Sequence, residues 1–249
     1  DALPISPPHF EDKYALVVIG STDIGNYYGI PEQDNPFNAA GRRMYNQLKM
    51  LGFEDENMIF LSSERASSRK LEETLKEFSG KIDSNDLFVA YISTHGSPFA
   101  LMFDNDGRES FSTSEIENAF EQVQPKLGLL YLESCYSGSV ASDLELPRYV
   151  IVSSTGKHTP SYSDTSFSSG IEFFSEFLEN SSDLNADGLV SIAEAFVKSN
   201  EDALAYQQRR ISEGSEFAEM ASFEQMMYVG SEVPDSAYSY ITGAEGWQK

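Results

Sequence analysis

The sequence predicts an α/β fold of three layers, in which helices flank both faces of a mostly parallel central sheet of about six strands. Short apolar runs, rich in β-branched and aromatic residues, occur along the chain without clean alternation. Such runs are typical of parallel strands that are buried on both faces. Stretches with helical spacing separate most of these runs, and a strand–helix–strand connection makes its two strands parallel. This alternation favours a sheet that helices cover on both sides.

The expected elements follow from these patterns in order. The strands span residues 14–20, 58–61, 87–94, 128–134, 149–153 and 225–229. The helices span residues 38–51, 67–78, 112–123, 168–178 and 191–211. Gly52 and Gly80 end the first two helices, because glycine readily takes the conformation that closes a helix. Ser112 and Glu115 form a capping box at the start of the third. Residues 99–103 and the turn at 104–107 predict a small hairpin.

Composition excludes several classes of function. The chain has 249 residues, enough for one domain with a sizeable core, and 40% of them are hydrophobic, which excludes wholesale disorder. Its 40 acidic and 17 basic residues give a net charge of −23, which disfavours nucleic acids and anionic membranes as partners. No apolar run approaches the ~20 residues that a membrane helix needs. No signal-peptide pattern remains, and we therefore expect a soluble protein that is secreted or otherwise exported.

Two of the expected strands end at side chains that together can perform nucleophilic catalysis. The third strand leads into His95 and the fourth into Cys135, the only cysteine of the chain. If these parallel strands are neighbours, their carboxyl ends lie about 4.8 Å apart at the edge where α/β folds bind ligands. A cysteine attacks as the thiolate, and a histidine beside it can take its proton. His9, in a proline-rich segment, and His158, after the fifth strand, are placed less favourably for this role. Taken alone, a lone cysteine is more often a small buried hydrophobe.

The residues around this pair resemble a known family. Thr94-His95-Gly96, followed by the string from Glu133 to Ser139, is similar to the motifs of the caspase-like clan of cysteine peptidases. Within that clan, the second string is most similar to the legumain family. The resemblance extends from about residue 14 to about residue 196.

This resemblance implies a caspase-like fold, in which the first strand borders the third and the third borders the fourth. It also implies a cysteine endopeptidase that acts on a peptide or protein substrate through an acyl-enzyme and needs no cofactor for catalysis. We expect one peptidase domain at residues 13–230, between a proline-rich lead-in at 1–12 and a tail at 231–249.

The family also implies roles for backbone groups and for an asparagine. The amides of Gly96 and Cys135 correspond to an oxyanion hole, and glycine allows a carbonyl to approach the backbone closely. Asn26, in the loop after the first strand, corresponds to an asparagine that orients the histidine in legumains. The alternatives are that Gly96 only turns the chain and that Asn26 only serves turn chemistry.

The expected substrate pocket departs from the legumain pattern. Tyr28 lies where legumains have part of a basic pair, and Tyr136 replaces an acid after the nucleophile. Ser161 and Tyr162 still resemble the segment that flanks the substrate. Strict preference for asparagine is therefore not expected, and a basic or apolar residue before the cut is the alternative. Asp23 and Asp164 are candidates for a negative pocket for a basic side chain.

Residues 183–194 match an independent motif, the calcium-binding loop D-x-[DN]-x-[DN]-G-x5-E, at every defined position. Gly188 supplies the turn, and the motif assigns oxygen ligands to Asp183, Asn185, Asp187, the carbonyl of Leu189 and Glu194. We expect a structural Ca²⁺ ion. The alternative is an acidic loop that only caps the helix starting near residue 191, which the helix dipole would favour.

Three other functions remain open at this point. A transpeptidase or ligase would use the same nucleophile and base, with an amine in place of water. A caspase-like binding module, stabilised by calcium, would not need both His95 and Cys135. A calcium-dependent scaffold leaves the position of both residues unexplained. The sequence does not indicate the oligomeric state.

Overall fold

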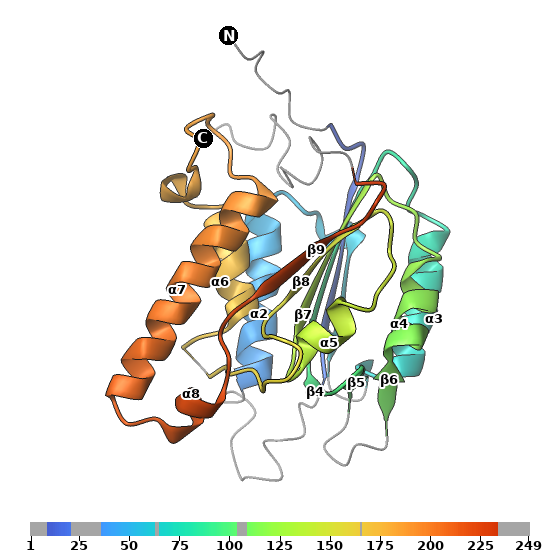
Figure 1. Ribbon diagram of the computed structural model, residues 1–249. Helices are drawn as coiled ribbons and strands as arrows, with labels where there is room; N and C mark the ends of the chain where they lie inside the picture. The colour runs from blue at the N-terminus through green and yellow to red at the C-terminus, as the bar shows by residue number, and fades with distance from the viewer. Residues whose placement is uncertain (1–8, 21–35, 63–64, 104–108, 165, 234–249) are drawn as a thin grey trace.

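The computed structural model describes residues 9–20, 36–62, 65–103, 109–164 and 166–233. Its centre is a six-stranded sheet with the order β2-β1-β3-β7-β8-β9 (Figure 1). The strands are β1 (Lys13–Ile19), β2 (Met58–Ser62), β3 (Leu87–Ser93), β7 (Leu127–Glu133), β8 (Tyr149–Ser153) and β9 (Met226–Val229). The first five strands are parallel to their neighbours, and β9 pairs antiparallel with β8. The predicted neighbours, first beside third and third beside fourth, are confirmed as β1 beside β3 and β3 beside β7.

Helices cover both faces of this sheet, which confirms the predicted three-layer architecture (Figure 1). One layer contains α2 (Pro36–Met50), α6 (Ser169–Glu176) and α7 (Ile192–Ser212). The other contains α3 (Ser68–Ser79), α4 (Thr113–Phe120) and α5 (Ser137–Ala141). The remaining helices are α8 (Glu216–Met220), η2 (Asp55–Asn57) and η4 (Asn180–Ser182), of which the last two are 3₁₀ turns. Every residue of β3 and β7 is buried, as the lack of alternation in their sequences predicts.

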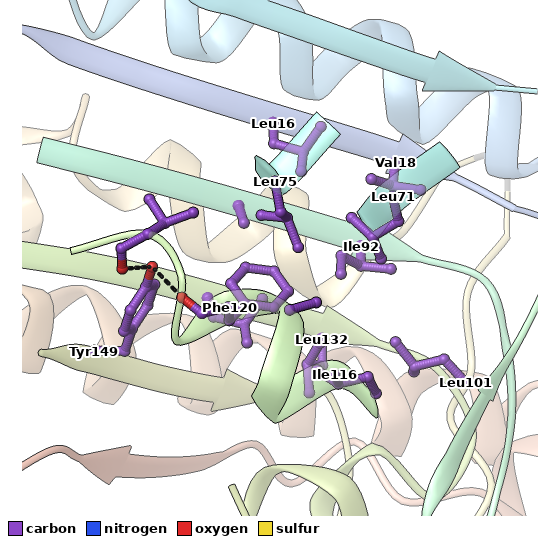
Figure 2. Packing of buried hydrophobic residues seen from close by; sticks show 14 of the residues in the cluster. Leu16, Val18, Leu71, Leu75, Ile92, Leu101, Ile116, Phe120, Leu132 and Tyr149 are labelled. Carbon is purple, nitrogen blue, oxygen red and sulfur yellow. Dashed lines mark hydrogen bonds between the residues drawn. The ribbon is translucent and has the colours of Figure 1, made fainter. Parts of the chain in front are cut away.

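The two faces of the sheet bury separate apolar clusters. Figure 2 shows the cluster under α3 and α4, where Leu71 and Leu75 pack against Leu16 and Val18 of β1. Tyr149 is the buried polar member of this cluster. Its hydroxyl donates hydrogen bonds to the carbonyls of residues 120 and 123, so its burial leaves no unpaired donor.

The helix boundaries follow the local signals of the sequence. The side chain of Ser67 accepts the backbone N–H of Lys70 at the start of α3, and Gly80 closes that helix. The capping box of Ser112 and Glu115 is present at the start of α4. The predicted helices and strands are all found, with boundaries shifted by a few residues.

Besides the two 3₁₀ turns, three elements were not predicted. The first is β4 (His95–Ser97), which joins β5 (Ala100–Met102) and β6 (Ser110–Ser112) in a small antiparallel sheet. The pairing of β5 with β6 confirms the hairpin, and its turn at 104–107 lies outside the described residues. The short helices α5 and α8 were also missed. Five residues are too few to show a helical period in the sequence.

No helix in the described part of the chain is both long and apolar enough to cross a membrane. Residues 1–8 of the expected lead-in (1–12) and residues 234–249 of the expected tail (231–249) lie outside the described residues. The expected domain limits stay predictions.

Candidate active site

The strand register aligns the two predicted catalytic residues at one edge of the sheet. Ser93 of β3 lies opposite Glu133 of β7, and the backbone N–H of Thr94 donates to the carbonyl of Glu133 at 3.1 Å. His95 and Cys135 each follow two residues beyond this pair. Both residues therefore lie just beyond the carboxyl ends of neighbouring strands and at the same level, as the sequence predicted.

The backbone of Gly96 lies directly against the peptide of Cys135. A Cβ atom at position 96 would lie 2.1 Å from the carbonyl oxygen of Cys135 and 2.8 Å from Oγ of Ser134. No real side chain fits at such distances, so only glycine permits this approach. The two backbone segments that the sequence assigned to the oxyanion hole are thus in contact.

A tight turn directs Cys135 away from its strand. Tyr136 has a left-handed conformation with φ of 58°, and its N–H donates to the carbonyl of Thr159 at 3.0 Å. The N–H of Ser137 donates to the carbonyl of Ser134 at 3.3 Å, and α5 begins at once. The left-handed conformation is uncommon for a residue other than glycine, and the sequence did not reveal it.

The thiol of Cys135 is partly buried and faces the segment after β8. Its Sγ atom lies 3.9 Å from the carbonyl oxygen of Ser161, to which it donates a weak hydrogen bond. Burial raises the pKa of the Cys135 thiol above its ordinary value, and backbone hydrogen bonds at Ser161 and at Cys135 itself oppose this only in part. A thiol with a raised pKa is neutral at neutral pH, so it needs a base to become nucleophilic.

The ring of His95 packs against α2. It meets the ring of Phe37 edge to face, with centroids 5.4 Å apart and planes at 76°. This contact restricts the orientation of the imidazole, and the sequence analysis did not assign Phe37 a role. The two competing histidines lie elsewhere. His158 is exposed. The carbonyl of His9 accepts a hydrogen bond from the ammonium group of Lys126, which precedes β7 at the opposite end of the sheet from Cys135.

Buried serine hydroxyls connect the turn at Cys135 with the segment that faces it. Oγ of Ser154 lies 3.3 Å from Oγ of Ser137 and 3.0 Å from Oγ of Ser161. Ser154 itself is fully buried at the end of β8. The sequence analysis missed this residue, because a serine after a strand carries no signal of its partners in a single sequence.

The segment from Ser161 is held by one carboxylate. Asp164 accepts hydrogen bonds from the hydroxyls of Tyr162 and Tyr206, each at 2.8 Å, and from the backbone N–H groups of Ser166 and Phe167. Burial alone would raise its pKa, but the hydrogen bonds from Ser166, Tyr162 and Tyr206 outweigh it and lower the pKa of Asp164 to about 2. Asp164 thus connects the segment after β8 to α7, and its two oxygens already accept hydrogen bonds from these donors.

Glu133, the last residue of β7, is a buried carboxylate at this edge. It accepts hydrogen bonds from the hydroxyls of Tyr91 and Ser168, the latter at 2.8 Å, through one oxygen. Its other oxygen is buried and has no hydrogen-bond partner among the described residues. Burial raises the pKa of Glu133, and the bonds from Tyr91 and Ser168 lower it part of the way back. Glu133 differs from the half-buried Asp164 in its burial, which its hydrogen bonds do not outweigh.

Two of the predicted site residues, Asn26 and Tyr28, lie outside the described residues, as does Asp23. Their expected roles therefore stay predictions. Thr94, which replaces an aspartate of legumains, donates its hydroxyl proton to the carbonyl of Met102 and so links β3 to β5.

The acidic loop at 183–194 is described in full, and its first side chains accept hydrogen bonds from the loop backbone. Asp183 accepts the N–H groups of Asp187 and Gly188 at 3.1 and 2.8 Å. Asn185 also accepts the N–H of Asp187, and Asp187 accepts that of Leu189 at 3.0 Å. Gly188 has a φ of 94°, the turn that the motif assigns to glycine.

The last side chain of this loop caps α7. The two oxygens of Glu194 accept the N–H groups of Asn185 at 2.9 Å and Ser191 at 2.8 Å. Ser191 accepts the N–H of Glu194 in return, which completes a capping box. No three Asp, Glu, His or Cys side chains within the described residues are gathered so that they could hold a metal ion. The hydrogen bonds between Glu194 and Ser191 are those that the helix-capping alternative requires.

A parallel sheet with aligned histidine and cysteine at its carboxyl edge defines a class, the cysteine peptidases of caspase-like fold. Comparison with solved structures agrees on the fold. The chain is similar to caspase-1 from Spodoptera frugiperda, with a TM-score of 0.61 and 13% sequence identity over 92% of this chain and 91% of that chain. No sequence of a curated protein matches.

The family model described as the Peptidase C13 family matches residues 71–221, which is more than half of the chain. The chain belongs to this family, the legumain family, and it is a cysteine peptidase. The matched region contains both His95 and Cys135.

Proposed function

We propose that the chain is a cysteine endopeptidase in which Cys135 is the nucleophile and His95 is the general base. The observation that carries this proposal is the register of β3 and β7, which brings both residues to the same level of one sheet edge. The raised pKa of the thiol supports a need for the base, because the thiolate is not populated without one.

The reaction proceeds in two halves. His95 takes the thiol proton, and the sulfur of Cys135 forms a bond to the carbonyl carbon of the scissile peptide. The C–N bond breaks as His95 returns the proton to the leaving amine, which leaves a thioester between enzyme and substrate. His95 then takes a proton from water, the resulting hydroxide attacks the thioester, and the free acid departs as Cys135 regains its proton.

The backbone N–H groups of Gly96 and Cys135 stabilise the oxyanion of each tetrahedral intermediate. Their close approach supports this role, since a side chain at position 96 would collide with the carbonyl oxygen of Cys135 and push the two backbone segments apart. Asn26 orients the imidazole by accepting its second N–H, as the family resemblance implies, and Phe37 restricts the same ring from α2.

Substrate binding involves Tyr28, Tyr136, Ser161 and Tyr162. The position of Ser161 within reach of the thiol supports this assignment for the segment after β8. We expect a basic or apolar residue before the cleaved bond, with asparagine not strictly required. A pocket without the polar groups that pair with a carboxamide loses its means of rejecting other side chains. The net charge of −23 favours the basic choice, because it attracts cationic peptides.

The loop at 183–194 binds Ca²⁺ as a structural ion in this proposal. The complete motif and the turn at Gly188 support it. Each carboxylate oxygen that accepts one N–H keeps a second lone pair for a ligand bond. Binding requires Asp183, Asp187 and Glu194 to converge further than they do here, so the ion would tighten the loop.

A combined labelling and library experiment tests the proposal. The purified protein is treated with a peptide bearing an electrophilic carbonyl, and the modified residue is located by mass spectrometry. Labelling at Cys135 that His95→Ala slows is the expected result. A positional-scanning peptide library then gives the residue before the cut. Labelling at no cysteine, despite turnover of peptides, would overturn the assignment of the nucleophile. A library in which asparagine dominates would overturn the proposed specificity alone.

A further inference from the structure

A groove runs beside the free edge of the central sheet, between α4 and β9. It has a volume of ≈ 400 Å³. Its floor is apolar and includes Leu146, Ile151 and Tyr228. Its rim is acidic, with Glu117 of α4 and Glu121, the residue that caps the C-terminal end of α4. These residues, together with Glu145 and Val229, define what we call the β9 groove.

The strand beside this groove has backbone groups that no described residue pairs with. β9 is the last strand in the order of the sheet, and it pairs only with β8 among the described residues. The N–H of Gly230 donates to the carbonyl of Tyr149, so residue 230 and its even-numbered neighbours face β8. Because a strand alternates, Met227, Val229 and Ser231 direct their N–H and C=O groups away from the sheet. Val229 is also 47% exposed. Such an edge is a template for another strand.

The negative charge around the groove favours some added strands over others. Glu117 accepts the backbone N–H of Glu145 at 2.7 Å, which holds both acidic residues at the rim. Burial raises the pKa of Tyr228, and the nearby Asp143 raises it further. Arg148 forms an ion pair with Glu232 at 3.2 Å and is therefore already engaged. A second copy of a chain with net charge −23 would be repelled here, whereas a cationic strand would be attracted.

We infer that the β9 groove binds an extended, basic segment of another protein, which adds to the sheet as a strand beside β9. Main-chain hydrogen bonds to Val229 and Ser231 supply affinity, as in other cases of strand addition. Every second side chain of the added strand lies over the groove. A lysine or arginine there lays its aliphatic stem on Tyr228 and reaches Glu117 or Glu121 with its charge.

This surface is separate from the candidate active site. Met226 pairs with Ser153 at the carboxyl edge of the sheet, but Val229 pairs with Val150 toward the opposite edge. The groove is lined by the part of β9 that lies away from Cys135. A bound segment thus leaves the catalytic edge open, and the inference does not depend on the proposed mechanism.

The test uses a defined probe, an acetylated and fluorescently labelled octapeptide of alternating lysine and valine. Binding is measured by anisotropy to the full chain carrying Cys135→Ala, which prevents cleavage of the probe. We expect saturable binding that weakens as salt is added. The double variant Glu117→Gln/Glu121→Gln should raise the Kd about tenfold. Its matched control, Glu72→Gln/Glu73→Gln, removes the same charge from α3 and should leave the Kd unchanged.

A second variant separates strand addition from charge attraction. Val229→Pro removes an N–H that points away from β8, so the ladder of the sheet is kept while the outer edge is blocked. It should also raise the Kd about tenfold, with an unchanged melting temperature and unchanged hydrolysis of a short peptide by the chain that retains Cys135. No saturable binding, or equal weakening by both pairs of glutamine substitutions, would overturn the inference. So would self-association of the free protein that Val229→Pro abolishes, since the occupant would then be a second copy.

Discussion

The carboxyl edge of the sheet that carries His95 and Cys135, here called the catalytic edge, and the acidic loop at 183–194 both match strong sequence motifs. They differ in how the residues of each motif are brought together. At the catalytic edge, residues 40 positions apart in the sequence are brought to one level by the register of β3 and β7. In the acidic loop, residues close in sequence remain close, and their side chains mainly accept hydrogen bonds from their own backbone. Long-range packing supports the first motif, and only local geometry supports the second.

This difference has consequences for the energetics of each region. The catalytic edge contains buried polar groups whose partners come from several elements, so a single substitution there has effects on both activity and stability. Residues 184–188 of the loop are exposed, and the hydrogen bonds of its side chains are local. We therefore expect large effects of substitution at the edge and smaller ones at the loop.

The largest effect is expected for the nucleophile and the base. Cys135→Ala and His95→Ala should each lower kcat/KM for a peptide substrate by at least about 10³-fold, with an unchanged circular dichroism spectrum. The double variant should be little worse than either single variant, since the two residues act as a unit. His158→Ala, at an exposed histidine, is the control and should retain activity. Near-full activity of Cys135→Ala would refute the site.

The next effect concerns Asp164, which ties the segment after β8 to α7. Asp164→Asn keeps the shape of the side chain but cannot accept from all four donor residues as the carboxylate does. We expect a loss of about 1–3 kcal/mol in the free energy of unfolding and a higher KM. Chemical denaturation and steady-state kinetics measure the two quantities. Glu224→Gln, at an exposed site, is the control, and an equal response of both variants would argue against the role of Asp164.

A smaller, pH-dependent effect is expected near the acidic loop. Burial raises the pKa of Glu176 to about 7, although a hydrogen bond from Ser182 opposes the shift. The folded state therefore binds a proton more tightly than the unfolded state. Its contribution to stability is complete below the ordinary pKa and is lost as the pH rises through about 7.

Glu176→Gln removes this titration. Relative to the variant, the melting temperature of the wild type should fall by roughly 3–6 °C between pH 5 and pH 8. Differential scanning calorimetry at several pH values measures the difference. A constant difference between the two proteins over this range would contradict the raised pKa.

The smallest effect is expected for calcium. At a few millimolar, Ca²⁺ should raise the melting temperature by roughly 2–4 °C, because an ion that binds only the folded state stabilises it by mass action. Glu194→Gln should remove this increment, whatever its effect on the starting stability through the lost cap. Mg²⁺ at the same concentration is the control. The absence of any calcium-dependent shift would leave the loop as a helix cap alone.

Much of the fold could be predicted because its signals are local. Capping serines, terminal glycines and apolar runs each act within a few residues, so the six strands and the five longer helices were identified with small errors at their ends. The order of β1, β3 and β7 was expected only from the family resemblance. The missed elements, β4, α5 and α8, are three to five residues long, and no periodicity can be read over so short a stretch.

By itself, the sequence determined which residues have the chemistry for catalysis and which end of each strand carries them. It singled out His95 and Cys135 as the candidates, because reactive side chains followed closely by glycine after buried strands have few structural explanations. Only the tertiary structure decided what surrounds them. Burial raises the pKa of Glu133, whose partners Tyr91 and Ser168 come from other elements, whereas hydrogen bonds that include one from Tyr206 of α7 lower the pKa of the half-buried Asp164. Such partners arise from packing between elements far apart in the chain, and no local pattern in one sequence encodes them.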